Sequence, residues 1–573
     1  MRSICSTTTE RHLESTEYRV QSTDLYSQTN SNSLNKQTRK TVLCTLYSAL
    51  SSLARPLALL IALVLAVSFA CPALATTMDD ILSLGMISVK TQYLNPLQAE
   101  EREFQSLTAL IYEGLFSLDD DYMPQLCIAA SCDSTTDGKH WTVRIRPDVY
   151  FHDGQQCTAY DVEATINEIL RLAETGLGQY NQLRYIISNV SVNSAESLQI
   201  TVNRPYYAVR FALTFPVLPR DQVQAAQPAG TGPFKVDQFI PANLLHLSAN
   251  ENYWKGAPTV KGINVDFKST NRELIMDYEY NRVDAAITRS ASAGQYQTGL
   301  TNLNIAYRTR QLETLLLNDS ANSFPLDNVE IRKAIRYAID FDTIANTVYM
   351  GMAKRTDTPL PAGTWMYKDN EEAYSYNPDK ARQILDEQGW KSNPNRDNGT
   401  RYTMVMVKGK QEERKLVLGL YVYEEQENSV RNQVAGMIKD YLAAVGISVH
   451  IEAVSFPTAA ARLQARNYDM AIAAFQMDVV PDPGFLLMPG NTGNYTGYRS
   501  SAMDKLCKKM REEREFSQYK QLLWDIQDQF CQDCPFICMW YRAGALLTRK
   551  VFTTVRDVRE PEILRGIESV GKP

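Results

Sequence analysis

Histidine is scarce in this chain of 573 residues, which has 5 His against 31 Tyr and 24 Pro. This scarcity counts against a metal centre built on histidine, the commonest metal-binding side chain. Outside residues 57–75, no stretch reaches the roughly 18 apolar residues that span a membrane. A net charge of -6 and a pI near 5.7 also argue against a nucleic-acid partner, which would require a basic domain.

Several catalytic motifs are missing as well. The sequence has no G-x-x-x-x-G-K-[ST] loop, no G-x-S-x-G elbow and no H-E-x-x-H helix. The short Gly230–Gly232 segment resembles a nucleotide loop, but Pro233 and a strand pattern follow it where a phosphate site needs a helix. We therefore expect no catalytic residue, no cofactor and no metal site. The composition, 44% hydrophobic and 22% charged, is that of a globular protein.

A leader is the clearest local feature. An apolar run at 57–70 follows a basic flank, as in a secretory signal, and Ala73–Ala75 fits a small-x-small cleavage site. Two alternatives stay open: Cys71 as a lipidation site, or 57–75 as an uncleaved anchor just long enough to span a bilayer. Residues 1–52 are long for the start of a signal, which is consistent with translation beginning further along the chain. All these alternatives predict export.

Beyond the leader, helical and strand patterns alternate, which is typical of an α/β protein. Alternating apolar residues predict strands, and apolar residues at helical spacing predict helices. Gly446 is expected to end one helix just before a strand. The predicted strands are 141–145, 234–239, 263–267 and 447–451, and the predicted helices are 161–172, 429–445 and one beginning at Asp327 or Asn328.

The part beyond the leader has seven cysteines: Cys127, Cys132, Cys157, Cys507, Cys531, Cys534 and Cys538. Cys531 and Cys534 form a C-x-x-C, a spacing used by redox and zinc motifs. No second pair and no paired histidine lies nearby to complete a zinc site. Three interpretations remain: small buried residues leading into an apolar strand at Cys534–Tyr541, a disulfide permitted by export, or a metal or redox site.

Six short segments, taken in order, resemble the family 5 extracellular solute-binding proteins, which are the peptide- and nickel-type receptors of ABC importers. The strongest lies in TVRIRPDVYFHDG and the following TAYDV, and another strong one is VEIRKAIRYAID. Each segment suits a scaffold better than a catalytic site. The segments are Asn95–Leu97, Ile111–Leu115, Thr142–Val162, Gly230–Phe234, Asn250–Trp254 and Val329–Asp340.

The resemblance implies a fold and a mode of action. The fold would be a type II periplasmic-binding protein with two α/β lobes, a hinge of crossing strands, and an extra domain inserted in the first lobe. The ligand would be trapped in the cleft by hinge closure. The expected divisions are a leader at 1–75, lobe I at 78–115, 229–308 and 531–573, the inserted domain at 116–228, and lobe II at 309–530.

The same resemblance implies the partners: a peptide or similar small polar solute, and the membrane permease of an ABC importer that receives it. A monomer is expected, without nucleic acid, in the periplasm or on the outer surface. Anchoring through the N-terminal segment or Cys71 is the further alternative.

Residues of the cleft can also be carried over from the resemblance. In peptide-binding relatives, strands pair with the peptide backbone and an acidic residue of the second lobe meets its α-amine. The pattern of an aromatic, an Asp and then Asp-Pro fits Phe475, Asp478 and Asp482–Pro483, with Pro481 as one extra residue. Ile472 stands where some oligopeptide receptors have an arginine for the peptide carboxylate, which argues against that mode of C-terminal recognition.

Three further ligand-binding candidates are Tyr498, Asn318 and Trp365. Tyr498 lies where the family's loop borders the cleft, and Arg499 beside it is a weaker candidate. The alternatives to a peptide receptor are a nickel or metal-chelate receptor of the same family and, from a different class, an exported hydrolase or a thiol oxidoreductase using Cys531 and Cys534.

Overall fold

The structure is a computed structural model of the chain. It describes residues 81–88, 90–98, 102–176, 178–296, 298–299, 302–320, 323–369, 375–423, 430–549 and 558–570. The predicted leader, with its cleavage site and Cys71, lies outside these residues. The described residues belong to one compact unit, Met78–Pro573. None of the helices they form is long and apolar enough to cross a membrane.

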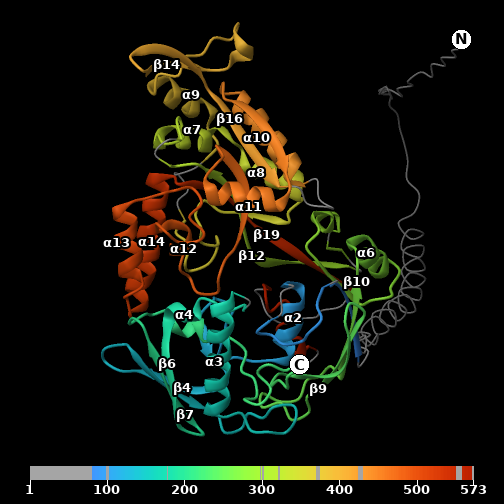
Figure 1. Ribbon diagram of the computed structural model, residues 1–573. Helices are drawn as coiled ribbons and strands as arrows, with labels where there is room; N and C mark the ends of the chain where they lie inside the picture. The colour runs from blue at the N-terminus through green and yellow to red at the C-terminus, as the bar shows by residue number, and fades with distance from the viewer. Residues whose placement is uncertain are drawn as a thin grey trace, which may run out of the picture. The chain divides into compact units, whose positions relative to one another are not determined.

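One mixed sheet of 11 strands organises this unit (Figure 1). Its order is β17-β16-β18-β12-β19-β11-β1-β10-β9-β8, with β13 paired to β19 off this path. The strands are β1 (Ile81–Ile87), β8 (Phe234–Ile240), β9 (Leu244–Ala249), β10 (Gly262–Lys268), β11 (Ala285–Thr288), β12 (Leu303–Leu317), β13 (Ala353–Arg355), β16 (Val417–Tyr423), β17 (Ser448–Val454), β18 (Met470–Gln476) and β19 (Phe536–Thr548).

Three smaller sheets complete the strands, and α3 packs against β6 and β7 of the four-stranded one. They are β4 (Ala129–Ser134), β5 (His140–Ile145), β7 (Ser197–Val202) and β6 (Ile187–Ser194); β2 (Phe116–Leu118) with β3 (Pro124–Leu126); and β14 (Tyr402–Val407) with β15 (Lys410–Lys415).

The helices lie between these strands in chain order. The described residues form α2 (Arg102–Ile111), α3 (Ala159–Thr175), α4 (Leu183–Ile186), α5 (Val209–Ala212), α6 (Asn271–Glu279), α7 (Val329–Ala338), α8 (Phe341–Tyr349), α9 (Pro378–Glu387), α10 (Val430–Ala443), α11 (Phe456–Ala465), α12 (Gly484–Leu487), α13 (Ser501–Met510), α14 (Phe516–Asp533) and the short 3-10 turns η1 (Ala291–Gln295), η2 (Asp397–Gly399) and η3 (Ile567–Ser569).

The long strands β12 and β19 run side by side, antiparallel, through the middle of the large sheet (Figure 1). Each of the two strands also has a second neighbour over its C-terminal part. Residues 545–548 of β19 pair with β11, and residues 311–317 of β12 pair with β18. The register between them shifts from Arg308 opposite Ala543 to Leu312 opposite Tyr541. Such a β-bulge adds residues to one strand and changes the direction of its side chains.

Two hydrophobic cores form on this framework. One gathers α7, α8 and α10 against β12, β16 and β18 through residues such as Ile335, Ile344 and Ile438. The other is larger and includes α3, the four-stranded sheet and α14, for example Ile166, Ile200 and Ile526. Burying apolar stripes of this kind is the main stabilising contribution to α/β layers.

Local sequence signals explain several boundaries. The side chain of Asn328 caps α7 by accepting a hydrogen bond from the Glu330 N–H at 2.9 Å. The N–H of Thr158 donates to Asp161 Oδ2 at 2.8 Å, as in a capping box. Gly446 follows α10 with φ 89°, a conformation that strongly favours glycine.

Two predicted boundaries need correction. The described part of the helix predicted at 429–445 ends at Ala443, because Ala444 and Val445 form the turn that leads to Gly446. The strand predicted to begin at Cys534 begins at Phe536. Helix α14 extends to Asp533, and Cys534 is its C-terminal cap with φ 43°. The Pro535 that follows cannot continue the helix, so the strand starts only after it.

Candidate functional site

A cavity of about 590 Å³ is bounded by well-separated parts of the chain. Its lining residues come from the end of α2, the 179–183 segment, the bulge of β12, the segment after β18, the middle of β19 and the 559–568 segment. Cavities of roughly 300–1,000 Å³ are typical of sites that enclose small molecules. The bulge of β12 therefore lies at the wall of a cavity large enough for a ligand.

Asp478 lines this cavity. The pairing of β18 with β12 places Gln476 opposite Gln311, and the Met477 N–H then donates to the Arg310 carbonyl at 2.8 Å. The side chain of Asp478 is partly buried and accepts a hydrogen bond from the Val480 N–H at 3.0 Å. Burial raises the pKa of Asp478, against the lowering effects of that N–H and of the Arg310 charge.

The neighbouring acid, Asp482, has a different environment. It also lines the cavity, but its Oδ2 accepts from Arg511 Nε at 2.6 Å and its Oδ1 accepts from the Gly484 N–H at 2.8 Å. The extra residue Pro481 is fixed in between, since its carbonyl accepts from the Tyr519 hydroxyl at 2.7 Å. Asp482 thus already has a charged partner within the protein.

Arg310 is a cavity residue that the sequence analysis did not single out. Its main-chain N–H donates to Glu560 Oε2 at 3.3 Å, while its Nε is buried without an acceptor among the described residues. Arg310 could be recognised as a cavity residue only from the bulge of β12. That bulge depends on pairing with a strand more than 200 residues away along the chain. A single sequence gives no such register.

Phe475 lies one strand position before Gln476 but lines a different cavity, of about 310 Å³. Its ring stacks on Tyr495 with centroids 6.1 Å apart and meets the edge of Phe485 at 6.4 Å. Side chains alternate between the two faces of a strand, so Phe475 and Gln476 point in opposite directions. Gln476 borders both cavities.

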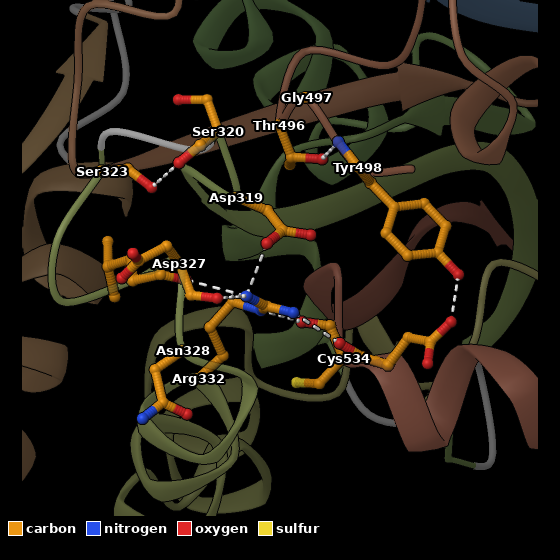
Figure 2. Close-up of polar contacts among 12 residues, drawn as sticks. Asp319, Ser320, Ser323, Asp327, Asn328, Arg332, Thr496, Gly497, Tyr498 and Cys534 are labelled. Atoms are coloured by element: carbon orange, nitrogen blue, oxygen red, sulfur yellow. Dashed lines mark hydrogen bonds and ion pairs between the residues drawn. The ribbon is translucent and has the colours of Figure 1, made fainter. Parts of the chain in front are cut away.

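Tyr498 and Asn318 are not among the residues lining the larger cavity. Tyr498 is buried and its hydroxyl donates to the carboxylate of Asp533, whose main-chain carbonyl accepts from Arg332 Nη2 at 2.8 Å. Figure 2 shows Tyr498 and Arg332 in this region. Burial and that hydrogen bond raise the pKa of Tyr498. The amide of Asn318 donates to the carbonyls of Arg466 at 3.0 Å and Tyr468 at 2.7 Å. Both side chains are occupied by contacts within the protein.

Trp365 packs behind the cavity wall. Its ring centroid is 6.2 Å from Phe211, a lining residue, and 5.0 Å from Phe516, and its Nε1 donates to the Tyr122 carbonyl at 3.4 Å. Aromatic pairs at these separations contribute stability beyond the area they bury. In this structure, Trp365 contacts a cavity residue and does not itself line the cavity.

Three of the family-like segments converge on one carboxylate, that of Glu113. It accepts hydrogen bonds from Tyr253 Oη and Trp254 Nε1, both at 2.8 Å, and from Lys255 Nζ at 2.9 Å. Thr231 Oγ1 donates to it at 3.3 Å. A buried carboxylate is tolerated when it is paired and hydrogen-bonded in this way. These residues therefore form a structural network at the edge of the cavity.

The described residues include no group of three or more His, Cys, Asp or Glu that could hold a metal ion. The cysteines in the described part of the chain are free thiols. Cys531 lies near the end of α14 and Cys534 caps that helix, so the C-x-x-C spans a helix terminus. Burial raises the pKa of Cys534 to about 11, which disfavours the reactive thiolate.

Comparison with known proteins gives the same class as these features. Residues 123–497 match the family model described as bacterial extracellular solute-binding proteins, family 5 Middle. The oligopeptide-binding protein AppA of Bacillus subtilis is 23% identical over 490 residues, which cover 80% of this chain and 86% of AppA. The glutathione-binding protein GsiB of Pectobacterium atrosepticum is 24% identical, covering 65% of this chain and 69% of GsiB.

Solved structures agree on the fold. AppA from Bacillus subtilis in complex with a nonapeptide has a TM-score of 0.64 at 20% identity, covering 85% of this chain and 98% of AppA. NikZ from Campylobacter jejuni in complex with Ni(L-His) has a TM-score of 0.65 at 20% identity, covering 82% and 94%.

The architecture and the cavity define a solute-binding protein of the type II periplasmic-binding-protein fold, as predicted. The chain belongs to the bacterial extracellular solute-binding proteins, family 5. The predicted class of function, a substrate-binding receptor of an ABC importer, is confirmed by this membership. Members of the family are extracellular transport binding proteins and not enzymes.

Proposed function

We propose that this receptor captures a short peptide and holds the peptide's protonated α-amine at Asp478. One observation carries the proposal: Asp478 lines the cavity, is partly buried and, among the described residues, has local main-chain hydrogen bonds but no ion pair, whereas Asp482 is paired with Arg511. A buried carboxylate without a cationic partner at ion-pair distance favours a cationic ligand group. Relatives named for oligopeptide and glutathione binding support a peptide ligand.

Capture would proceed by closure of two lobes on the ligand, followed by docking to the ABC permease. In this proposal, lobe I comprises 78–115, 229–308 and 531–573, the inserted domain 116–228, and lobe II 309–530. The receptor acts as a monomer and performs no covalent chemistry. Its leader exports it and is either cleaved after Ala75, which releases the receptor, or keeps the receptor at the membrane through Cys71 or the apolar segment.

A nickel chelate is the second candidate ligand, favoured by the similarity to NikZ in complex with Ni(L-His). The described residues offer no three-ligand metal group, so a chelate would have to bring its own ligands. Phosphate and nucleotide ligands have no comparable support.

The test is a thermal and scattering screen of the purified protein against short peptides and against nickel with L-histidine. A ligand that binds only the native state adds about 2.7 kcal/mol of stability at a hundredfold excess over Kd. The melting temperature rises as a result. Closure should also reduce the radius of gyration. A response to peptides alone supports the proposal, and a response to nickel-histidine alone replaces it.

A further inference from the structure

The turn between α13 and α14 touches segments that come much earlier in the chain. The Tyr207 N–H donates to the Glu513 carbonyl at 2.7 Å, and Arg514 Nη1 donates to the Thr136 carbonyl. Gly138 makes room for this approach, because a Cβ atom at that position would lie 2.7 Å from Arg514 Cδ. Thr136 and Tyr207 flank strands of the four-stranded sheet, whereas Glu513 and Arg514 lie between strands of the large sheet.

Five aromatic side chains continue this contact, and we call them the aromatic latch: Tyr207, Phe211, Trp365, Phe516 and Tyr519. The ring centroid of Tyr207 lies 5.4 Å from that of Phe516 and 5.3 Å from that of Tyr519. The ring of Trp365 lies 6.2 Å from Phe211 and 5.0 Å from Phe516. Aromatic pairs at these separations attract one another. Tyr207 and Phe211 follow β7 of the four-stranded sheet, and the other three lie between strands of the large sheet.

The aromatic latch adjoins the larger cavity. Phe211 lines this cavity, and the other four latch residues do not. The Tyr519 hydroxyl donates to the Pro481 carbonyl at 2.7 Å, and Pro481 lies between the cavity acids Asp478 and Asp482. Helix α14 therefore carries part of the latch and also supports the wall of the cavity.

The contact across the latch is narrow. Among the described helices and strands, α14 packs extensively against α13 and against no element of the four-stranded sheet. The side chains of Tyr207 and Phe516 are only half-buried. Parts of a chain that share a small interface are expected to move relative to one another. Separation of the two sides would open the cavity and break the aromatic pairs.

We propose that the aromatic latch holds the cavity closed and so determines how long the receptor keeps its ligand. This inference rests on the proposed capture of a peptide by closure. A contact present in the closed form and lost in the open form shifts the equilibrium between the two by its own free energy. Since a ligand leaves through the open form, a weaker latch should raise the dissociation rate.

Two double variants change the latch in opposite directions, and neither needs a ligand. Tyr207→Ala with Phe516→Ala removes the central rings. Tyr207→Cys with Glu513→Cys should allow a cross-link, because a hydrogen bond already joins the two main chains and a disulfide bridges only residues this close. In small-angle scattering of the purified protein, the radius of gyration should be largest for the alanine pair and smallest for the cross-linked pair. Tyr185→Ala, which removes an exposed aromatic ring on α4, should leave the radius unchanged.

Tri-alanine is the probe for the effect on binding. Its affinity should fall about tenfold in the alanine pair, because each aromatic pair of this kind contributes up to about one decade. Stopped-flow measurements should show that the dissociation rate rises by a similar factor. Tyr185→Ala should change neither quantity.

The outcomes separate the latch from peptide capture. Equal radii for the alanine pair and the cross-linked pair overturn the latch, whether or not tri-alanine binds. A lower melting temperature of the alanine pair, with unchanged radius and dissociation rate, also overturns it, because the contact is then a fixed part of the fold. Failure of tri-alanine to bind the unaltered protein counts against peptide capture, and the scattering comparison still decides the latch.

Discussion

Glu313 and Arg310 lie on the same strand, β12, but only the Glu313 side chain has hydrogen-bonding and charged partners among the described residues. The carboxylate of Glu313 is fully buried and accepts from Tyr349 Oη at 2.6 Å and Trp540 Nε1 at 2.8 Å. Arg431 lies 3.3 Å from it. Arg310, at the bulge, has a buried Nε with no acceptor among the described residues. The charge of Glu313 is therefore compensated within the protein, whereas the Nε of Arg310 has no such partner among the described residues.

Charge compensation separates the carboxylates of the scaffold from those of the site in this protein. Burial opposes ionisation of Glu313, but Arg542 and Arg431 together lower its pKa. For Asp478, burial dominates and the pKa is raised. A carboxylate whose charge is stabilised by the fold contributes to stability, whereas one whose charge is disfavoured by the fold is poised to gain from a cationic ligand.

The largest expected effect comes from removing the charge of Glu313. Glu313→Gln leaves Arg431 and Arg542 without their shared counter-charge, so the free energy of unfolding should fall by about 3–5 kcal/mol. Denaturant titration measures this loss. The exposed Glu412, on β15, offers a matched control: Glu412→Gln should change stability by less than about 0.5 kcal/mol. Equal losses in the two variants would contradict the assignment of Glu313 to the scaffold.

The next effect concerns affinity. Asp478→Asn keeps the side-chain shape but removes a charge-assisted hydrogen bond to the peptide amine, a contribution of about 1.5–3 kcal/mol. Affinity for a free peptide should fall about tenfold to a hundredfold, and far less for the same peptide with an acetylated amine. Calorimetry with both peptides measures the difference. Stability should change by less than about 1 kcal/mol, since the fold does not depend on the Asp478 charge.

Asp482→Asn completes that experiment. It breaks the ion pair with Arg511, so it should lower stability without changing the ratio of affinities for free and acetylated peptide. If Asp482→Asn shows an amine-dependent loss of affinity and Asp478→Asn does not, the residue that binds the peptide amine is Asp482 and not Asp478.

The sequence supported the fold more fully than it supported the site. Apolar periodicity located α3 and β5, and the family-like segments indicated the two-lobe architecture because they consist of turns, caps and the network around Glu113. Turns and caps of this kind are set by residues close together in the sequence. The anchor candidate Asp478 came from such a pattern, and the structure brings it to the cavity wall.

The rest of the site could not be predicted in the same way. Arg310 depends on the bulge between β12 and β19, and the register of strands so distant in sequence is not written in either segment alone. Phe475 fits the family pattern, but strand alternation turns it away from the cavity that Asp478 lines. Whether an aromatic or polar residue contacts a ligand or its own neighbours is decided by long-range packing, as for Trp365 and Tyr498.

The smallest expected effect is a pH dependence. The pKa of Asp478 lies above its ordinary value of 3.8 because of burial. Affinity for a free peptide should therefore begin to fall, as pH is lowered, before an ordinary aspartate would protonate. Below the pKa of Asp478, affinity should fall about tenfold per pH unit.

The stability of the ligand-free protein should change in the opposite direction and increase as pH is lowered. A raised carboxyl pKa contributes stability that is present at pH below 3.8 and is lost as pH rises through the folded value. Calorimetry and thermal unfolding across roughly pH 4–7 measure both trends. The acetylated peptide and Asp478→Asn should each flatten the affinity profile. A profile that stays steep in Asp478→Asn would assign the titration to another carboxyl of the cavity, with Glu562, whose pKa burial also raises, as the first to examine.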